Sequence, residues 1–187
     1  MSQQDPKKAI IENLSKASYL SPGDQKILRQ HGLLAQAESI HFLKSLYLPP
    51  YGLYAVSYKN DAGQQRGGIC LVRQDEQGEW QVRSVVHDNE KRQITQEEMQ
   101  ASQPWVLLSG AVGEKPFWAG GSVIDHGFGV THVLLRGSNG VLLEDSVEEN
   151  LVLFLADKQM ETPIEALLYN HQQTLISTQT IFRRWEK

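Results

Sequence analysis

The chain has one cysteine, Cys70, among its 187 residues. A single cysteine excludes an intramolecular disulfide and any zinc site built from several cysteines. Cys70 lies in the apolar run Gly68 to Val72, which is typical of a β-strand. We therefore expect its thiol to pack as a small apolar side chain.

Long hydrophobic runs are also missing, since the longest, Leu151 to Ala156, has six residues. A helix that crosses a bilayer needs about 20 apolar residues, so we expect no direct membrane insertion. The first residues, Met1 to Lys8, lack the apolar stretch of a signal peptide. Taken as it stands, the sequence predicts a cytoplasmic protein. An extracytoplasmic setting is the alternative if a signal or anchor has been removed.

An excess of positive charge is absent as well, because the net charge is -4. A protein that binds nucleic acid usually carries a basic stripe with aromatic residues among its lysines and arginines. The sequence has only isolated basic pairs, so we expect no nucleic-acid partner. With 40% hydrophobic and 21% charged residues, the composition is that of an ordinary globular protein.

The common cofactor motifs are missing too. The segment Gly110 to Lys115 has the wrong spacing for a phosphate loop, and Pro116 prevents a helix from following it. Gly127 and Gly129 lack the third glycine of a dinucleotide site. The usual serine-hydrolase and zinc-protease motifs do not occur. We expect no cofactor.

The N-terminal segment, residues 1–35, has the start signals of two short helices. Asp5 is placed to cap the first helix, and Pro6 suits its first position. Ser21 and Pro22 repeat the same signals for the second helix. Helices this short are expected to pack on a sheet rather than stand alone.

From residue 36 to residue 103 the pattern predicts an antiparallel β meander followed by a connector helix. The turns between its strands are rich in Asn, Asp and Gly. The predicted strands are 39–48, 53–59, 67–74 and 79–87. Residues 88–103 form the expected connector, in which Thr95 and Glu98 have the spacing of a capping box.

Residues 104–187 contain a series of short apolar runs separated by turn signals, typical of an immunoglobulin-like β-sandwich. The predicted strands are 105–112, 122–125, 129–136, 141–147, 151–156, 164–169 and 174–178. The predicted fold is therefore mainly β, with an antiparallel meander, a sandwich, two N-terminal helices and a connector helix. The parts 1–35, 36–103 and 104–187 are separate in this prediction, and one continuous domain is the alternative.

The dipeptide Asn139-Gly140 predicts a hairpin between two of these strands. A four-residue turn, Gly137 to Gly140, would place His132 opposite Asp145. An imidazole beside a carboxylate occurs in catalytic and pH-sensing sites. It is also an ordinary cross-strand pair that satisfies two polar groups.

His126 adds a further nitrogen ligand near this pair, which raises the hypothesis of a metal site. The spacing matches no zinc or calcium loop, so we expect no metal. A hydrolytic or metal-dependent enzyme centred on His132, Asp145 and His126 remains an alternative.

Aromatic residues between Pro116 and Gly120 suggest a loop that binds a ligand or a partner. Phe117 and Trp118 are adjacent there, and Trp supplies a large contact area at low entropic cost. The alternative is that both side chains close one end of the sandwich. Tyr47 and Tyr51, on either side of Pro49-Pro50, form a second, weaker aromatic edge.

The strand-and-turn pattern of residues 105–178 resembles β-sandwich modules of bacterial surface or membrane-anchored proteins of unknown function. The resemblance is carried by Gly129 to Val133, Asn139-Gly140 and Leu143 to Val147, and continues at Val152 to Phe154 and Ala166 to Asn170. It implies a non-enzymatic sandwich and an extracytoplasmic setting. No functional residue carries over from it.

We therefore predict a non-enzymatic binding or regulatory module that recognises a protein or small-molecule ligand through the aromatic loop. The enzyme described above is one alternative. A structural subunit that forms homo-oligomers is another, because apolar residues on both faces of the hairpin call for cover on two sides.

Overall fold

The computed structural model describes residues 5–17, 20–87 and 103–182. Its fold is mainly β, with antiparallel sheets and two α-helices, as the sequence predicts. The chain divides into two compact units, Met1–Glu90 and Lys91–Lys187. The predicted connector helix, with Thr95 and Glu98 as its capping box, lies outside the described residues.

Unit 1 begins with the two predicted helices, α1 (Pro6–Lys16) and α2 (Pro22–Gln30). The carboxylate of Asp5 accepts a hydrogen bond from the Lys7 amide at 2.9 Å. The Ser21 hydroxyl accepts one from the Asp24 amide at 3.3 Å. Both predicted N-caps are confirmed, because each side chain satisfies an amide that the first helical turn leaves without a partner.

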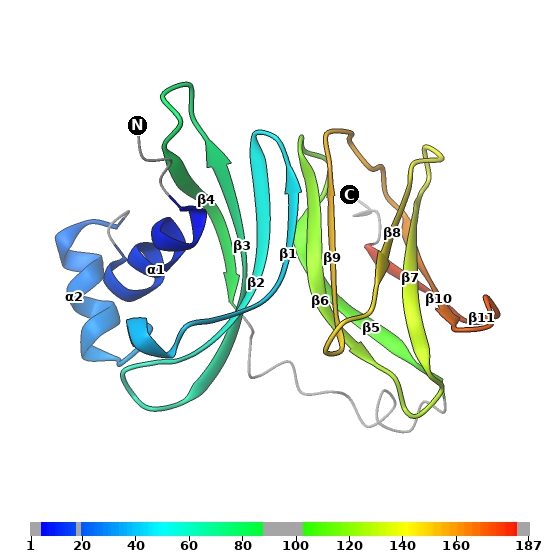
Figure 1. The fold of residues 1–187 in the computed structure, drawn as a ribbon, viewed down its shortest axis with the longest axis horizontal. Coiled ribbons are helices and arrows are strands. Elements are labelled where there is room, and N and C mark those ends of the chain that lie inside the picture. Colours follow the sequence, from blue (N-terminus) through cyan, green and yellow to red (C-terminus); the bar gives the residue numbers. More distant parts are fainter. Residues whose placement is uncertain (1–4, 18–19, 88–102, 183–187) are drawn as a thin grey trace, which may run out of the picture. The chain divides into compact units, whose positions relative to one another are not determined.

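The sheet of unit 1 is the predicted antiparallel meander, and its strands pair in the order β1-β2-β3-β4 (Figure 1). A short 3-10 helix, η1 (Ala37–Ser39), precedes it. The strands are β1 (His41–Leu48), β2 (Tyr51–Lys59), β3 (Gln65–Gln74) and β4 (Trp80–His87).

One face of this sheet forms a core with helix α1. Ile10 and Leu14 of the helix pack in one cluster with Tyr54, Cys70 and Val72 of the sheet. Helix α1 thus packs on the sheet, as its short length predicts, because an isolated helix of this length cannot bury its apolar side. The helices and the meander make one unit.

Unit 2 contains seven described strands in two antiparallel sheets, with the orders β5-β6-β9 and β11-β10-β7-β8. Strand β6 is longer than the predicted strand 122–125. The strands are β5 (Trp105–Ala111), β6 (Phe117–Ile124), β7 (Val130–Gly137), β8 (Leu142–Ser146), β9 (Leu151–Ala156), β10 (Ile164–Asn170) and β11 (Leu175–Phe182).

The two sheets of unit 2 pack face to face and share one core (Figure 1). Phe117 and Phe154 come from the first sheet, and Val133, Leu135 and Leu168 from the second. All five side chains are 1% exposed or less. This arrangement is a β-sandwich, as the series of short strands separated by turn signals predicts.

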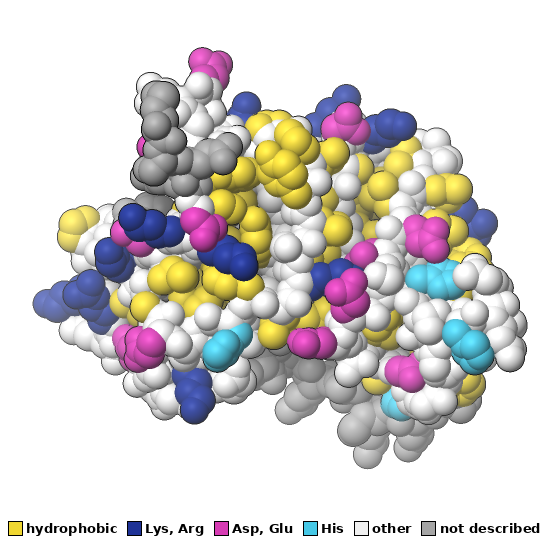
Figure 2. Space-filling model, viewed as in Figure 1, with side chains coloured by type: hydrophobic (Ala, Val, Ile, Leu, Met, Phe, Trp, Pro, Cys, Tyr) yellow, Lys and Arg dark blue, Asp and Glu magenta, His cyan; other side chains and the backbone are white. Residues whose placement is uncertain are grey.

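Figure 2 shows charged side chains of both signs scattered over this face, among hydrophobic and other side chains. This mixture is consistent with the small net charge of the chain, -4.

Candidate functional site

The predicted aromatic loop is a strand. Phe117 and Trp118 begin β6, where Phe117 is fully buried in the sandwich core and Trp118 is 3% exposed. A Cβ atom at Gly121 would collide with the Leu107 carbonyl group of the neighbouring strand. Gly121 thus allows two strands to approach closely, and both Gly120 and Gly121 lie within β6 rather than in a turn. The prediction that Phe117 and Trp118 contact a ligand from an exposed loop is wrong.

The second predicted edge, around Pro49-Pro50, lies at the end of the unit 1 sheet. Tyr47 is 60% exposed, and its ring centroid lies 6.0 Å from that of Trp80. Tyr51 pairs with Leu48, one position away from Tyr47 in the register, so the two tyrosines are on opposite faces of the sheet. They do not form one binding surface.

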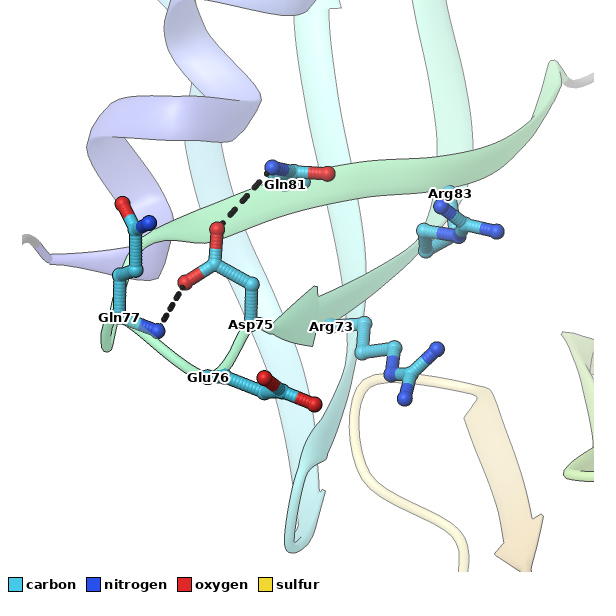
Figure 3. A pocket seen from close by; sticks show the side chains of 6 residues that line it. All are labelled: Arg73, Asp75, Glu76, Gln77, Gln81 and Arg83. Carbon is cyan, nitrogen blue, oxygen red and sulfur yellow. Dashed lines mark hydrogen bonds between the residues drawn. The ribbon is translucent and has the colours of Figure 1, made fainter.

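A polar hollow of about 420 Å³ lies beside Tyr51, where β3 and β4 meet their connecting turn. We call it the turn-end hollow. Figure 3 shows its lining, which comes entirely from the β3–β4 hairpin of unit 1. The lining residues are Arg73, Asp75, Glu76, Gln77, Gln81 and Arg83.

Asp75 holds the turn of this hairpin in place. Its Oδ1 accepts hydrogen bonds from the backbone amides of Gln77 and Glu79, both at 2.9 Å. Its Oδ2 accepts one from the Gln81 side-chain amide at 3.2 Å. Gly78 completes the turn with a φ of 85°, a conformation that favours glycine. The Asp75 carboxylate therefore has a structural task and both of its oxygens are engaged.

A hydrogen bond also joins the β3–β4 turn to the β1–β2 turn at Pro49-Pro50. The Gln74 amide donates a hydrogen bond to the Pro50 carbonyl oxygen at 2.8 Å. Strands β2 and β3 pair from Tyr51 opposite Arg73 onward without a break in register. The backbone of the Arg73 end of β3 is thus hydrogen-bonded to β2 and to Pro50, which limits its movement.

Arg73 and Arg83 supply the positive charge of the hollow, and both are exposed. Within the part of the chain that the structure describes, neither guanidinium group has a carboxylate oxygen within 4.0 Å. The Arg73 Cζ atom lies 5.7 Å from the centroid of the Tyr51 ring. A guanidinium above an aromatic ring is a stabilising contact that leaves its N–H groups available.

The predicted His132–Asp145 pair is not formed. The hairpin of β7 and β8 exists, but Gly137 donates its amide to the Val141 carbonyl oxygen around a loop of three residues, 138–140. This register places His132 opposite Ser146 and Asp145 opposite Val133. A slip of one residue moves a side chain to the other face of the sheet. His132 and Asp145 therefore lie on opposite faces.

Each member of that predicted pair has other partners. The His132 ring stacks on Tyr169 with centroids 5.0 Å apart, and its Nε2 lies 3.6 Å from a Glu144 carboxylate oxygen. Asp145 accepts a hydrogen bond from the Leu153 amide at 2.7 Å. Since Leu153 belongs to β9, this bond joins the two sheets of the sandwich. The Asp145 carboxylate thus has a structural role between the two sheets.

His126 lies in the exposed turn between β6 and β7, at a φ of 51°. The same turn is closed by Asp125, which accepts hydrogen bonds from the Gly129 and Val130 amides at 3.0 and 2.8 Å. Among the described residues, no three His, Cys, Asp or Glu side chains come together as metal ligands. The proposed centre of His132, Asp145 and His126 is not assembled.

The sequence interpretation identified Tyr51 but missed Arg73 and Arg83. In the sequence each arginine is a single basic residue, which by itself does not predict a binding site. A usable signal did exist, because both flank the predicted turn 75–78 on strands expected to pair. Building the register of that hairpin would have placed them near one another.

Comparison with protein families, with curated proteins and with solved structures gave no match to this chain. In the described part of the chain, neither helix is long and apolar enough to span a bilayer.

Proposed function

We propose that this protein is a non-enzymatic binding or regulatory module that recognises a protein or small-molecule ligand through the turn-end hollow. The hollow replaces the aromatic loop of the sequence prediction as the recognition site. Tyr51 keeps a part in it through its contact with Arg73.

One observation carries this proposal. The hollow combines a hydrogen-bonded turn with two arginines that have no carboxylate partner among the described residues. The hydrogen-bonded turn fixes the backbone between the two arginines, so a ligand that binds their side chains does not have to order that backbone. Arg is also among the residue types enriched in binding surfaces.

The enzyme alternative has less support. General acid–base chemistry needs side chains within hydrogen-bond reach of one another or of a common substrate. His132 and Asp145 occupy opposite faces of their sheet, and His126 lies in a separate turn. We therefore retain the non-enzymatic proposal.

The structural-subunit alternative depends on the outer face of the β7–β8 hairpin. Leu142 is 56% exposed there. It shares this face with the polar side chains of His132, Glu144 and Arg136. Arg136 is paired with Glu165 of β10 at 2.8 Å. A face in which charged residues separate the apolar ones is a weak basis for a stable dimer.

We further propose that the sandwich is immunoglobulin-like and that the protein is bacterial. When the strands of unit 2 are lettered A to G in chain order, the sheets contain A-B-E and G-F-C, as in immunoglobulin domains. Strand D, which is β8, pairs with C. The compartment stays a proposal as well: cytoplasmic for the sequence as given, or extracytoplasmic if a signal or anchor was removed.

The proposed site can be tested with amide-resolved NMR spectra of the whole chain. We would add a panel of small molecules and short peptides that includes anionic, cationic and neutral members. The expected result is a set of shifts concentrated on the backbone amides from Arg73 to Arg83. Shifts confined to other parts of the chain, or none for any probe, would overturn the proposal.

A further inference from the structure

We propose that the turn-end hollow binds an oxyanion, either a carboxylate or a phosphate group, between Arg73 and Arg83. This inference rests on the proposed function and adds the chemical class of the ligand.

The arginines supply donors that match such a group. A guanidinium presents five N–H donors in a planar fork, which suits two oxygens of a carboxylate or phosphate. Neither fork is occupied by a carboxylate within the described ranges 5–17, 20–87 and 103–182. In the view of Figure 3 both arginine side chains extend to the same side, away from Asp75 and Gln77. An anion between them would relieve the repulsion of two like charges.

Tyr51 positions the guanidinium group of Arg73. Its ring lies beneath the Arg73 guanidinium, with 5.7 Å between Cζ and the ring centroid. This contact restricts a long side chain that would otherwise lose rotamer freedom on binding. Tyr51 is therefore a positioning residue, and its ring rather than its hydroxyl group does the positioning.

The two acidic residues of the lining have different effects. Asp75 is engaged by three N–H donors, which compensate its charge. Glu76 is exposed, and no hydrogen bond or ion pair holds its carboxylate within the described part of the chain. It opposes the binding of an anion. Removing the charge of Glu76 should thus strengthen binding, an effect opposite in sign to that of the arginine changes.

The test is a titration of the whole chain with inorganic phosphate and, separately, with succinate, followed by amide shifts and repeated at higher ionic strength. We expect saturable shifts at Arg73 to Arg83 for at least one anion, and weaker binding as salt screens the charges. Phosphate alone would assign a phosphate ligand, and succinate alone a carboxylate. No saturable shift for either anion overturns the inference.

Single substitutions measure how much each residue of the hollow contributes to the affinity for the anion. R73Q and R83Q should each weaken binding about tenfold or more, as expected for the loss of a charge-assisted hydrogen bond. R29Q, which removes an exposed arginine of α2 and changes the net charge equally, is the matched control and should bind as the unchanged protein does. Y51F should keep the affinity and Y51A should lower it. E76Q should raise it.

The outcomes distinguish this inference from the proposed function. If neutral or cationic probes shift the hollow and neither anion does, the oxyanion inference fails and the binding module stands. If no probe of any charge shifts the hollow, both fail. Equal weakening by R29Q and R73Q would show a general charge effect and would also overturn the oxyanion site.

Discussion

At the scale of single residues, Cys70 illustrates how burial controls chemistry. It lies in the middle of β3 and is fully buried against the helix side of the sheet. Burial raises the pKa of its thiol to about 12. Since the thiolate is the reactive form of cysteine, the side chain should be inert in the folded protein.

We therefore expect Cys70 to resist a disulfide reagent in native buffer and to react fully in denaturant. The measurement is the absorbance of the released thiol over time under the two conditions. Native reaction at the rate of a free cysteine would contradict the buried position of Cys70.

The environment of His87 leads to a prediction about how the stability of the protein depends on pH. The Nδ1 atom of His87 lies 2.9 Å from the Tyr58 hydroxyl oxygen at the end of β4. Partial burial of the imidazole lowers the pKa of His87 from its ordinary value of 6.5, and the positive charge of Arg66 lowers it further. The unfolded chain then binds the proton more readily than the folded one.

Stability from His87 should thus be complete above about pH 6.5 and should fall as the pH drops through the lowered pKa. We expect H87Q to lose less stability than the unchanged protein between pH 7.5 and pH 5. The measurement is the urea midpoint of each protein at both values. Because carboxylates also titrate in acid, only the difference between the two proteins is diagnostic. An equal fall in both would contradict the role of His87.

At the scale of elements, the β7–β8 hairpin shows how a loop sets a register. Gly140, with a φ of 79°, follows Ser138 and Asn139 in the three-residue loop. Such loops commonly combine a turn with a left-handed glycine. The resulting register brings Asp145 to the Leu153 amide and separates it from His132.

A double-mutant cycle tests this register. We expect D145A to lower the free energy of unfolding by about 1–3 kcal/mol, because it leaves the Leu153 amide without its acceptor. H132A should add its own effect independently, since the two side chains are on opposite faces. The measurement is urea unfolding of both single variants and the double variant. A coupling energy above about 0.5 kcal/mol would instead favour the predicted His132–Asp145 pair.

Much of the architecture could be predicted from local sequence signals. The meander followed from alternating apolar residues between clear turns, and the helices from their caps. The predictions of the hairpin register and of the aromatic loop were wrong for identifiable physical reasons. Asn139-Gly140 predicts a hairpin but does not fix the length of its loop, and the register depends on that length. Gly120-Gly121 resembles a turn, although at Gly121 the glycine serves the close approach of two strands.

The candidate site could be predicted only in part. Tyr51 was singled out for its aromatic ring and its position beside Pro49-Pro50. Arg73 and Arg83 become a site only when β3 and β4 pair and the Asp75 turn brings the lining together. That neither arginine has a carboxylate partner among the described residues depends on where the neighbouring carboxylates lie, which no local pattern specifies.

At the scale of the whole molecule, helix α1 belongs to the core of unit 1, whereas α2 has no buried residue. Ile10 of α1 is completely buried, whereas Ile27 of α2 is 52% exposed. I10A should lower the free energy of unfolding of the protein by about 2–5 kcal/mol, since it removes buried methyl groups and leaves a cavity. I27A is the matched control and should change it little. The measurement is urea unfolding followed by circular dichroism. Equal effects would contradict the shared core of helix and sheet.

If a ligand binds at Arg73 and Arg83, the arginine side chains report it directly. The decisive measurement is the set of arginine Nε–H signals of the whole chain during a titration with inorganic phosphate and with succinate. We predict that the Arg73 and Arg83 signals move in a saturable way with at least one anion, while that of Arg29 stays in place. Unchanged Arg73 and Arg83 signals, or equal shifts at all three arginines, would contradict it.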